Sequence, residues 1–91
     1  MIIYKATNLI NGKVYIGQTK KELKRRISEH KSELKLNGRN QLFYNALRKH
    51  GWYNFEWTII DTANSREELN EKEIYWINFY KSMEKANGYN F

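Results

Sequence analysis

Five polar side chains in this 91-residue chain are of the kinds that enzymes use to move protons or to hold charge. They are two phenols, a guanidinium, an imidazole and a carboxylate: Tyr4, Tyr15, Arg26, His30 and Glu73. This set offers possible bases, a fixed cation and a carboxylate that can bind a metal. It suits attack of water on a phosphodiester, because negative charge then builds on the phosphate oxygens and on the leaving group.

The two tyrosines belong to a predicted hairpin at the start of the chain. Residues 2–8 and 13–18 are short β-rich runs that flank Asn11 and Gly12. Asn-Gly between two such runs is a strong short-range hairpin signal. With a two-residue loop residue 8 faces residue 15, and with a four-residue loop residue 6 does.

Both registers give the same division of the hairpin into faces, because opposed residues point to the same side of a sheet. One face carries the two phenols beside small or polar residues: Tyr4, Ala6, Asn8, Tyr15 and Gly17. The other face carries Ile3, Val14 and Ile16. The phenols can be core rings with hydroxyls at the rim, or they can line a site with room for a ligand beside Ala6 and Gly17.

A basic helix is predicted to follow, over about residues 20–36. Thr19 and Glu22 have the spacing of a capping box, and Asn37–Gly38 is a plausible end. Leu23, Ile27 and Leu34 form one apolar stripe at 100° per residue.

His30 falls within this apolar stripe, Arg26 lies about 60° to one side of it, and Arg25 points toward solvent. The structural alternatives are a hydrogen-bonded core histidine for His30 and a weak ion pair with Glu22 for Arg26.

Two further elements are expected in the middle of the chain. Asn40 can cap a second helix that ends before Gly51. Its expected buried face is Leu42, Phe43, Ala46 and Leu47. Residues 53–60 alternate between apolar and polar side chains, which predicts a third strand paired with the hairpin.

Glu73 is the most informative anomaly in the sequence. Ser65 and Glu68 form a second capping box, which predicts a helix over about residues 66–80. Its apolar stripe is Leu69, Trp76, Ile77 and Tyr80. Glu73 lies within this stripe, and a buried carboxylate needs a cation. That cation is either a basic side chain of the core rim or a divalent metal, of which Mg²⁺ and Mn²⁺ suit a carboxylate with waters. Residues 87–91 are expected to form a turn and a docking segment.

Composition limits the classes of function that remain. The chain has a net charge of +6 and no cysteine, so zinc fingers, thiol nucleophiles and disulfide partners are excluded. Eight of the sixteen basic residues fall in residues 20–39. This cluster fits a nucleic-acid partner and an ordinary solvated helix face equally well, so charge alone does not decide between them. Without an apolar run of membrane length or a signal peptide, we expect one soluble, cytoplasmic domain over residues 1–91.

Taken together, the motifs resemble those of the GIY-YIG nucleases over nearly the whole chain. Ile2-Ile3-Tyr4 corresponds to the first motif, although the family usually has glycine at its first position, and Tyr15-Ile16-Gly17 corresponds to the second. The segment from Leu23 through Arg26 to His30 is similar to the family's arginine helix. The phage homing endonuclease branch is the most similar, on three segments: Lys49-His50-Gly51, Tyr75-Trp76-Ile77 on the Glu73 helix, and Gly88-Tyr89-Asn90.

The resemblance implies an α+β fold in which a three-stranded antiparallel sheet is flanked by three helices, in the order β-β-α-α-β-α. It also implies that Glu73 binds one divalent cation, Mg²⁺ or Mn²⁺, and that Arg26 stabilises charge on the phosphoryl group. Tyr4 or Tyr15, with Tyr4 preferred, would accept a proton from the attacking water, helped by nearby cations that favour phenolate. His30 would assist the transfer or orient a neighbour.

Supporting residues and partners follow from the same resemblance. Supporting positions at the edge of the site would be Gly17, Gln18 and Asn90. DNA would contact the basic helix, with Lys20, Lys24, Arg25 and Lys31 as candidates. We expect a DNA endonuclease that leaves 5′-phosphate and 3′-hydroxyl ends, monomeric in isolation and able to dimerise transiently on DNA, in a bacterial or phage-infected cell.

Three functions fit these expectations. The first is the catalytic domain of a homing endonuclease, whose separate DNA-recognition region would lie outside this chain. The second is a structure-specific or repair nuclease of the same family. The third is a basic nucleic-acid-binding module without catalysis, which salt-sensitive DNA binding without metal-dependent cleavage would identify.

Overall fold

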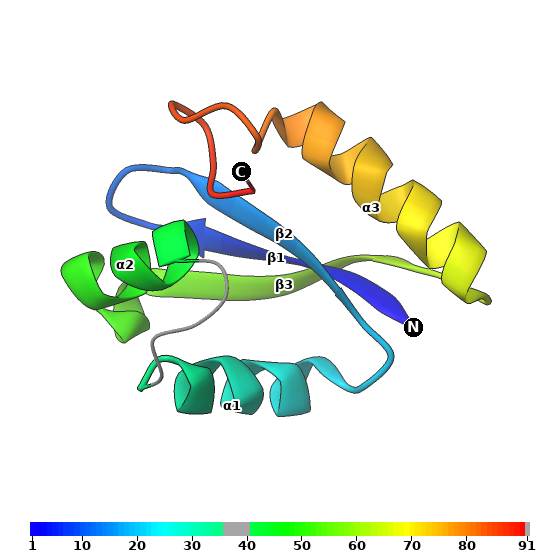
Figure 1. The fold of residues 1–91 in the computed structure, drawn as a ribbon, viewed down its shortest axis with the longest axis horizontal. Coiled ribbons are helices and arrows are strands. Elements are labelled where there is room, and N and C mark those ends of the chain that lie inside the picture. The colour runs from blue at the N-terminus through cyan, green and yellow to red at the C-terminus, as the bar shows by residue number, and fades with distance from the viewer. Residues whose placement is uncertain (36–40, 91) are drawn as a thin grey trace.

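The computed structural model describes residues 1–35 and 41–90, and it shows a three-stranded sheet between helices (Figure 1). The elements in chain order are β1 (Ile2–Asn8), β2 (Val14–Thr19), α1 (Leu23–Glu33), α2 (Gln41–His50), a short 3₁₀ helix (Trp52–Asn54), β3 (Phe55–Thr62) and α3 (Arg66–Tyr80). The predicted α+β class and the order β-β-α-α-β-α are confirmed.

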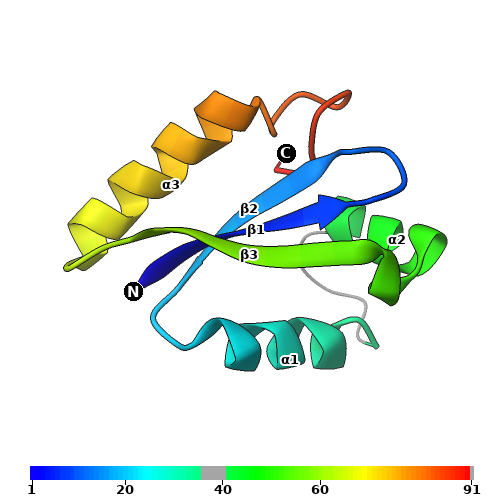
Figure 2. The same cartoon turned by 180° about the vertical axis from the view of Figure 1, so that it is seen from behind.

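The sheet is antiparallel with the order β2-β1-β3, so the hairpin's first strand is central and β2 is an edge strand. Figure 2 shows the opposite edge, where β3 lies in front. Ala6 pairs with Tyr15 and Tyr4 with Gly17, which is the register of the four-residue loop. Within that loop Gly12 has φ +77°, a left-handed conformation that glycine adopts readily.

The two faces of the sheet carry different side chains, as strand parity predicts. In Figure 1 α1 lies below the sheet and α2 lies at its left end, and the two helices cover a mainly aromatic cluster that includes Tyr4, Tyr15, Phe43, Tyr44 and Phe55. Above it, α3 covers a mainly aliphatic cluster: Ile3, Val14, Ile16, Ala63 and Leu69. Leu69 has no exposed surface, and its burial contributes about 1.5–3 kcal/mol to folding.

The capping box predicted at Thr19 is wrong. Thr19 is the last residue of β2 and pairs with Ile2, so its backbone belongs to the sheet and cannot begin a helix. Its hydroxyl accepts a hydrogen bond from the N–H of Lys21 at 3.1 Å, and α1 begins only at Leu23, with Glu22 at the N-cap. The predicted stop at 37–38 and the predicted cap at residue 40 lie outside the described residues.

The middle of the chain departs from its prediction at two side chains. Leu42 is 42% exposed, and Tyr44 is buried beside Phe43, because α2 turns its 43–44–47 side toward the sheet. Tyr53 is 86% exposed, because the chain forms the 3₁₀ helix after Gly51 and β3 begins only at Phe55.

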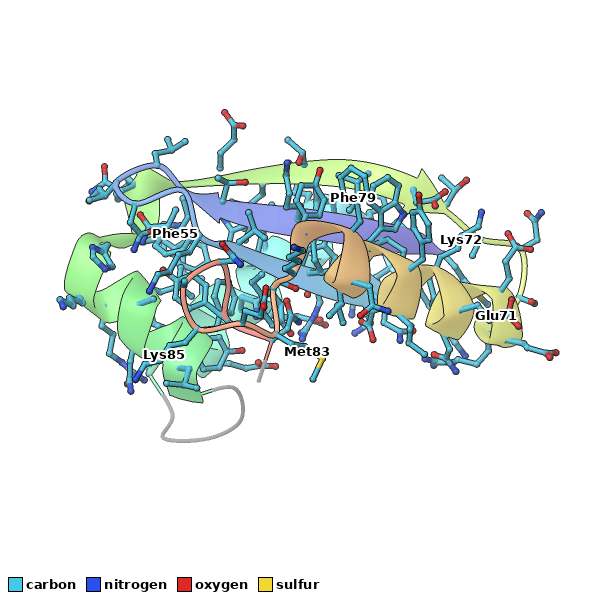
Figure 3. All side chains as sticks on the ribbon, turned by 90° about the horizontal axis from the view of Figure 1, so that it is seen from above. Phe55, Glu71, Lys72, Phe79, Met83 and Lys85 are labelled. Atoms are coloured by element: carbon cyan, nitrogen blue, oxygen red, sulfur yellow. The ribbon has the colours of Figure 1, made fainter. Side chains whose placement is uncertain are left out.

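The second capping box is confirmed, since the Ser65 hydroxyl accepts a hydrogen bond from the N–H of Glu68 at 3.1 Å. Figure 3 shows Lys72 and Phe79 on the side of α3 that faces β1 and β3. Lys72 forms an ion pair there with Asp61, at 3.3 Å between Nζ and Oδ1.

The segment after α3 docks as expected. Gly88 forms an isolated parallel bridge with Val14, and Tyr89 is buried. No helix in the described part of the chain is long and apolar enough to span a membrane.

Candidate active site

A hydrogen-bonded cluster joins β1 to α1 beneath the sheet. The hydroxyl of Tyr4 lies 2.7 Å from Nε2 of His30, and both side chains are buried. The strand alternation of β1 turns Tyr4 downward, and the 3.6-residue period of α1 turns His30 upward to meet it. The structure therefore brings together two of the five residues predicted from the sequence, in direct contact.

Gly17 leaves the space that the Tyr4 phenol fills. A Cβ atom at Gly17 would stand 2.4 Å from both Cζ and the hydroxyl oxygen of Tyr4, far inside van der Waals contact. The strand pairing of Tyr4 with Gly17 sets this contact. Glycine is therefore required here for the tyrosine to reach His30, and the supporting role predicted for Gly17 has a steric cause.

Arg26 extends the cluster toward solvent. Its guanidinium hydrogen-bonds with Tyr4 and lies 3.2 Å from Oε1 of Glu29 and 3.5 Å from Oε1 of Glu33. Its side chain is 21% exposed, whereas that of Arg25 is 71% exposed, which matches the orientations that helical periodicity predicts. The acidic partners of Arg26 are thus the two that follow it on α1. Glu22 instead occupies the N-cap position of α1, where its side chain makes no capping hydrogen bond.

Burial decides the charge states of the two central groups. Burial raises the pKa of Tyr4 well above its usual range, the Tyr15 phenol adds to the rise, and Arg26 offsets only part of it. Burial and then the Arg26 charge lower the pKa of His30 to about 4. At neutral pH the pair is therefore a neutral phenol and a neutral imidazole. Arg26 favours the phenolate at Tyr4, as expected, but desolvation is the larger effect.

Tyr15 lies on the same face, as the hairpin parity predicts. Its ring stacks on Phe43 with centroids 4.1 Å apart and stands edge-on to His30 at 6.1 Å. The Tyr4 and Tyr15 rings are 6.4 Å apart. Both phenols thus lie around the same imidazole, and Tyr15, at 9%, is the more exposed of the two.

Glu73 lies on the opposite side of the sheet, on α3. It is half-buried, burial raises the pKa of its carboxyl, and a hydrogen bond with Gln18 offsets part of that rise. Strand alternation places Gln18 toward α3 and Gly17 toward α1. These two consecutive residues of β2 therefore link the carboxylate above the sheet to the Tyr4 cluster below it, and the candidate site straddles the edge strand.

The two predicted supporting amides have distinct partners. The Gln18 side chain donates to Asn70 at 2.9 Å and accepts from Arg66 at 3.1 Å, which fixes it beside Glu73. The Asn90 side chain accepts from the N–H of Ile16 and donates to its C=O, both at 2.8 Å. Asn90 therefore holds the backbone of β2 at the residue before Gly17.

The basic residues predicted to contact DNA are exposed around α1. Lys20, Lys24, Arg25 and Lys31 all lie on the surface. An open groove of about 570 Å³ runs along the helix, and its lining residues are Lys21, Arg25, Ser28, Glu29, Ser32 and Glu33. Lys31 points elsewhere, with Nζ 5.7 Å from the centroid of the Tyr53 ring.

Two residues of the cluster were missed by the sequence prediction. Tyr44 lies with its hydroxyl 2.9 Å from Nδ1 of His30, and it donates a hydrogen bond to the carboxylate of Glu33. Tyr44 follows Phe43 on an apolar helix face and therefore reads as a core ring. Glu33 lies seven residues after Arg26, about two helical turns, which places it on the same side of α1 and is the one signal that could have identified it.

Comparison with known proteins agrees with this arrangement. A family model described as the GIY-YIG catalytic domain matches residues 1–90. A solved structure of the catalytic domain of homing endonuclease I-TevI is 29% identical, with a TM-score of 0.82 and coverage of 96% of this chain and 92% of that chain. A structure of a glutamate-to-alanine variant of the catalytic domain of intron endonuclease I-TevI is 30% identical, with a TM-score of 0.83 and coverage of 97% and 89%. No curated protein matches.

The chain belongs to the GIY-YIG family. It is accordingly a nuclease catalytic domain that hydrolyses phosphodiesters, with DNA as the implied substrate. Ile2, at the position where the family usually has glycine, continues β1 and pairs with Thr19 and Thr62 in the sheet.

GIY-YIG nucleases generally use a divalent metal, and the donor set around Glu73 fits such an ion. No group of three or more histidine, cysteine or carboxylate side chains that could hold a metal occurs in the described ranges. A single carboxylate is nevertheless the donor set of an ion that keeps most of its waters and completes its shell with substrate phosphate, as Mg²⁺ does. Burial raises the pKa of Glu73 because it destabilises the ionised carboxylate. A bound cation would stabilise that ionised form.

Proposed function

We propose that this chain is the catalytic domain of a homing endonuclease, which hydrolyses one DNA phosphodiester per site to leave 5′-phosphate and 3′-hydroxyl ends. The similarity to the I-TevI catalytic domain over 96% of the chain supports the homing role. The observation that carries the chemistry is the contact between Tyr4 and His30, supported by the Arg26 guanidinium beside it.

In the proposed reaction water attacks phosphorus and the bond to the 3′ oxygen breaks. Tyr4 takes a proton from the attacking water while its own proton passes to Nε2 of His30, so the phenol never carries a full charge. Arg26 stabilises the charge that builds on the phosphoryl oxygens. The departing 3′ oxygen takes a proton from solvent. We assign Tyr15, the more exposed phenol, to orienting the water or the phosphate.

Glu73 would hold one Mg²⁺ or Mn²⁺ ion. When bound, such an ion supplies a Lewis acid against the scissile phosphate and the leaving oxygen. The role of the chain itself is to keep Glu73 beside Gln18 at the sheet edge. The exposed lysines and Arg25 would bind the phosphate backbone, which makes affinity fall with salt.

A plasmid nicking assay tests the proposal. Purified Glu73→Gln and Arg26→Ala variants should lose at least about 100-fold of cleavage, since each removes a charge from the transition state. Arg25→Ala, one residue away and pointing to solvent, is the matched control and should lose much less. Chelator should abolish wild-type cleavage, and Mg²⁺ or Mn²⁺ should restore it. Full cleavage by Glu73→Gln would disprove the metal role.

A second assay separates the homing proposal from its alternative within the family. Branched or flapped DNA should be cleaved no faster than a linear duplex of the same sequence. A strong preference for branched substrates would instead identify a structure-specific repair nuclease.

A further inference from the structure

The hydrogen bonds around His30 form a continuous chain of four side chains from α1 and α2 to β1. Glu33 bonds with Tyr44, Tyr44 lies 2.9 Å from Nδ1 of His30, and Nε2 of His30 lies 2.7 Å from Tyr4. His30, Tyr4 and Tyr44 are each at most 2% exposed, so bulk solvent has little access to the hydrogen bonds between them. Each hydroxyl has one proton, which makes the direction of every bond deducible.

The direction is set at the carboxylate end. An ionised carboxylate can only accept hydrogen bonds, so the Tyr44 hydroxyl spends its single proton on Glu33. Although burial opposes ionisation of Glu33, its hydrogen bond with Tyr44 and the charge of Arg26 hold its pKa below the usual value. The Tyr44 oxygen therefore accepts from His30, and Nδ1 of His30 must carry the proton.

The same logic carries the direction across the ring to Tyr4. His30 is neutral at pH 7, with a pKa of about 4, so a proton on Nδ1 leaves Nε2 without one. Nε2 can then only accept, and the Tyr4 hydroxyl spends its proton on it. The Tyr4 oxygen keeps lone pairs and has no proton left to offer a third group.

We propose that Glu33 and Tyr44 are positioning residues that fix the tautomer of His30 and thereby make Tyr4 a hydrogen-bond acceptor toward the reacting water. This inference rests on the proposed nuclease function and deepens it. The arrangement excludes Tyr4 as a donor to a phosphate oxygen and suits it to accept a proton. The imidazolium that forms on proton transfer faces Glu33 through Tyr44, as a carboxylate behind a catalytic histidine does in serine hydrolases.

The charges around His30 favour this assignment. Glu33 and Glu29 raise the pKa of His30 and Arg26 lowers it. Glu29 interacts with Arg26 and Lys21, whereas the Tyr44 hydroxyl donates to Glu33. Glu29 therefore raises the pKa of His30 as Glu33 does, but it does not orient the Tyr44 hydroxyl. Glu29→Gln is therefore the matched control for Glu33→Gln.

The test is the tautomer itself, measured on ¹⁵N-histidine-labelled protein by two-bond ¹H–¹⁵N correlation at pH 7 without DNA or metal. The sequence has two histidines, and His50 serves as the internal reference. Wild-type His30 should show a protonated Nδ1 and an unprotonated Nε2. Tyr44→Phe, which keeps the ring, should convert His30 to a mixture of tautomers. Glu33→Gln should also weaken the preference, and Glu29→Gln should leave it unchanged.

In the NMR measurement two results would overturn the proposal: a wild-type His30 protonated on Nε2, or an unchanged tautomer in Tyr44→Phe. Cleavage supplies the second arm, in which Tyr44→Phe should lower kcat at least about tenfold with little change in KM. Tyr89→Phe, a buried phenol on the same side of the sheet, should cleave at the wild-type rate. Wild-type cleavage by Tyr44→Phe would remove the positioning role, whereas the nuclease proposal itself stands or falls with Glu73→Gln and Arg26→Ala.

Discussion

The two faces of the sheet use the same strands for opposite purposes. Toward α1 and α2, alternate residues of β1 and β2 present phenols that meet a buried imidazole. Toward α3, the intervening residues present aliphatic side chains that pack around Leu69. The polar face depends on hydrogen bonds with defined donors and acceptors. The aliphatic face depends on close packing of apolar side chains. A substitution among the aliphatic side chains can therefore lower stability without removing a catalytic group, whereas a substitution in the polar cluster removes one.

Leu69→Ala should give the largest effect on stability and the smallest on chemistry. The side chain has no exposed surface, so truncation leaves a cavity and should cost about 2–5 kcal/mol of the free energy of unfolding. Urea denaturation measures this loss, and cleavage per folded molecule should stay within about twofold of wild type. A fall in specific activity of the folded fraction would show that the two faces are not independent.

The pH dependence of stability should report the polar face. The pKa of His30 is about 4 in the folded chain and 6.5 without burial, so the unfolded state binds the extra proton first as pH falls. Stability from this group is complete above pH 6.5 and is lost down to about pH 4, by roughly 3 kcal/mol in total. Urea denaturation at intervals across this window measures the decline.

The control for that window is a pair of histidine substitutions. His30→Gln should flatten the decline between pH 6.5 and 4.5, whatever its effect at neutral pH, and His50→Gln should leave the decline in place. A wild-type stability that stays constant over the same interval would contradict the burial of a neutral imidazole.

Gly17→Ala should have the smallest effect on stability and should still abolish cleavage. A Cβ atom 2.4 Å from the Tyr4 hydroxyl forces the phenol aside and should cost about 1–3 kcal/mol. Because the displaced phenol loses His30, nicking activity should vanish in protein that remains folded by circular dichroism. Gly12→Ala, in the loop with open space around it, should keep activity; equal activity in both variants would contradict the steric role of Gly17.

Sequence patterns predicted the two faces well because they depend only on strand and helix periodicity. Parity placed both tyrosines with Gly17, and the 100° helical step turned Arg26 and His30 inward. The same kind of argument failed at Thr19, where a capping pattern identical in form to that at Ser65 was overridden by pairing of Thr19 with Ile2. A local pattern cannot tell whether the preceding strand has ended.

The parts of the site that sequence did not predict depend on tertiary packing. Tyr44 is recognisable only once α2 is placed against His30, since an aromatic residue on an apolar helix face is ordinarily core. Glu73 was predicted to face inward, but its position on the other side of the sheet depends on which face α3 packs against, and the sequence pattern does not specify that face. The neutral state of Tyr4 required the degree of burial, which composition and spacing do not give.

The side-chain amide of Asn90 bonds both the N–H and the C=O of Ile16, which makes it a one-residue substitute for a neighbouring strand. These bonds join residues 74 positions apart. Contacts so distant in sequence form late, because the loop between them must first be closed. On a ribosome the edge of β2 would stay open until nearly the whole domain had emerged. The nuclease site would therefore be completed only when the last residues of this domain are in place, which delays DNA cleavage by a partly folded domain.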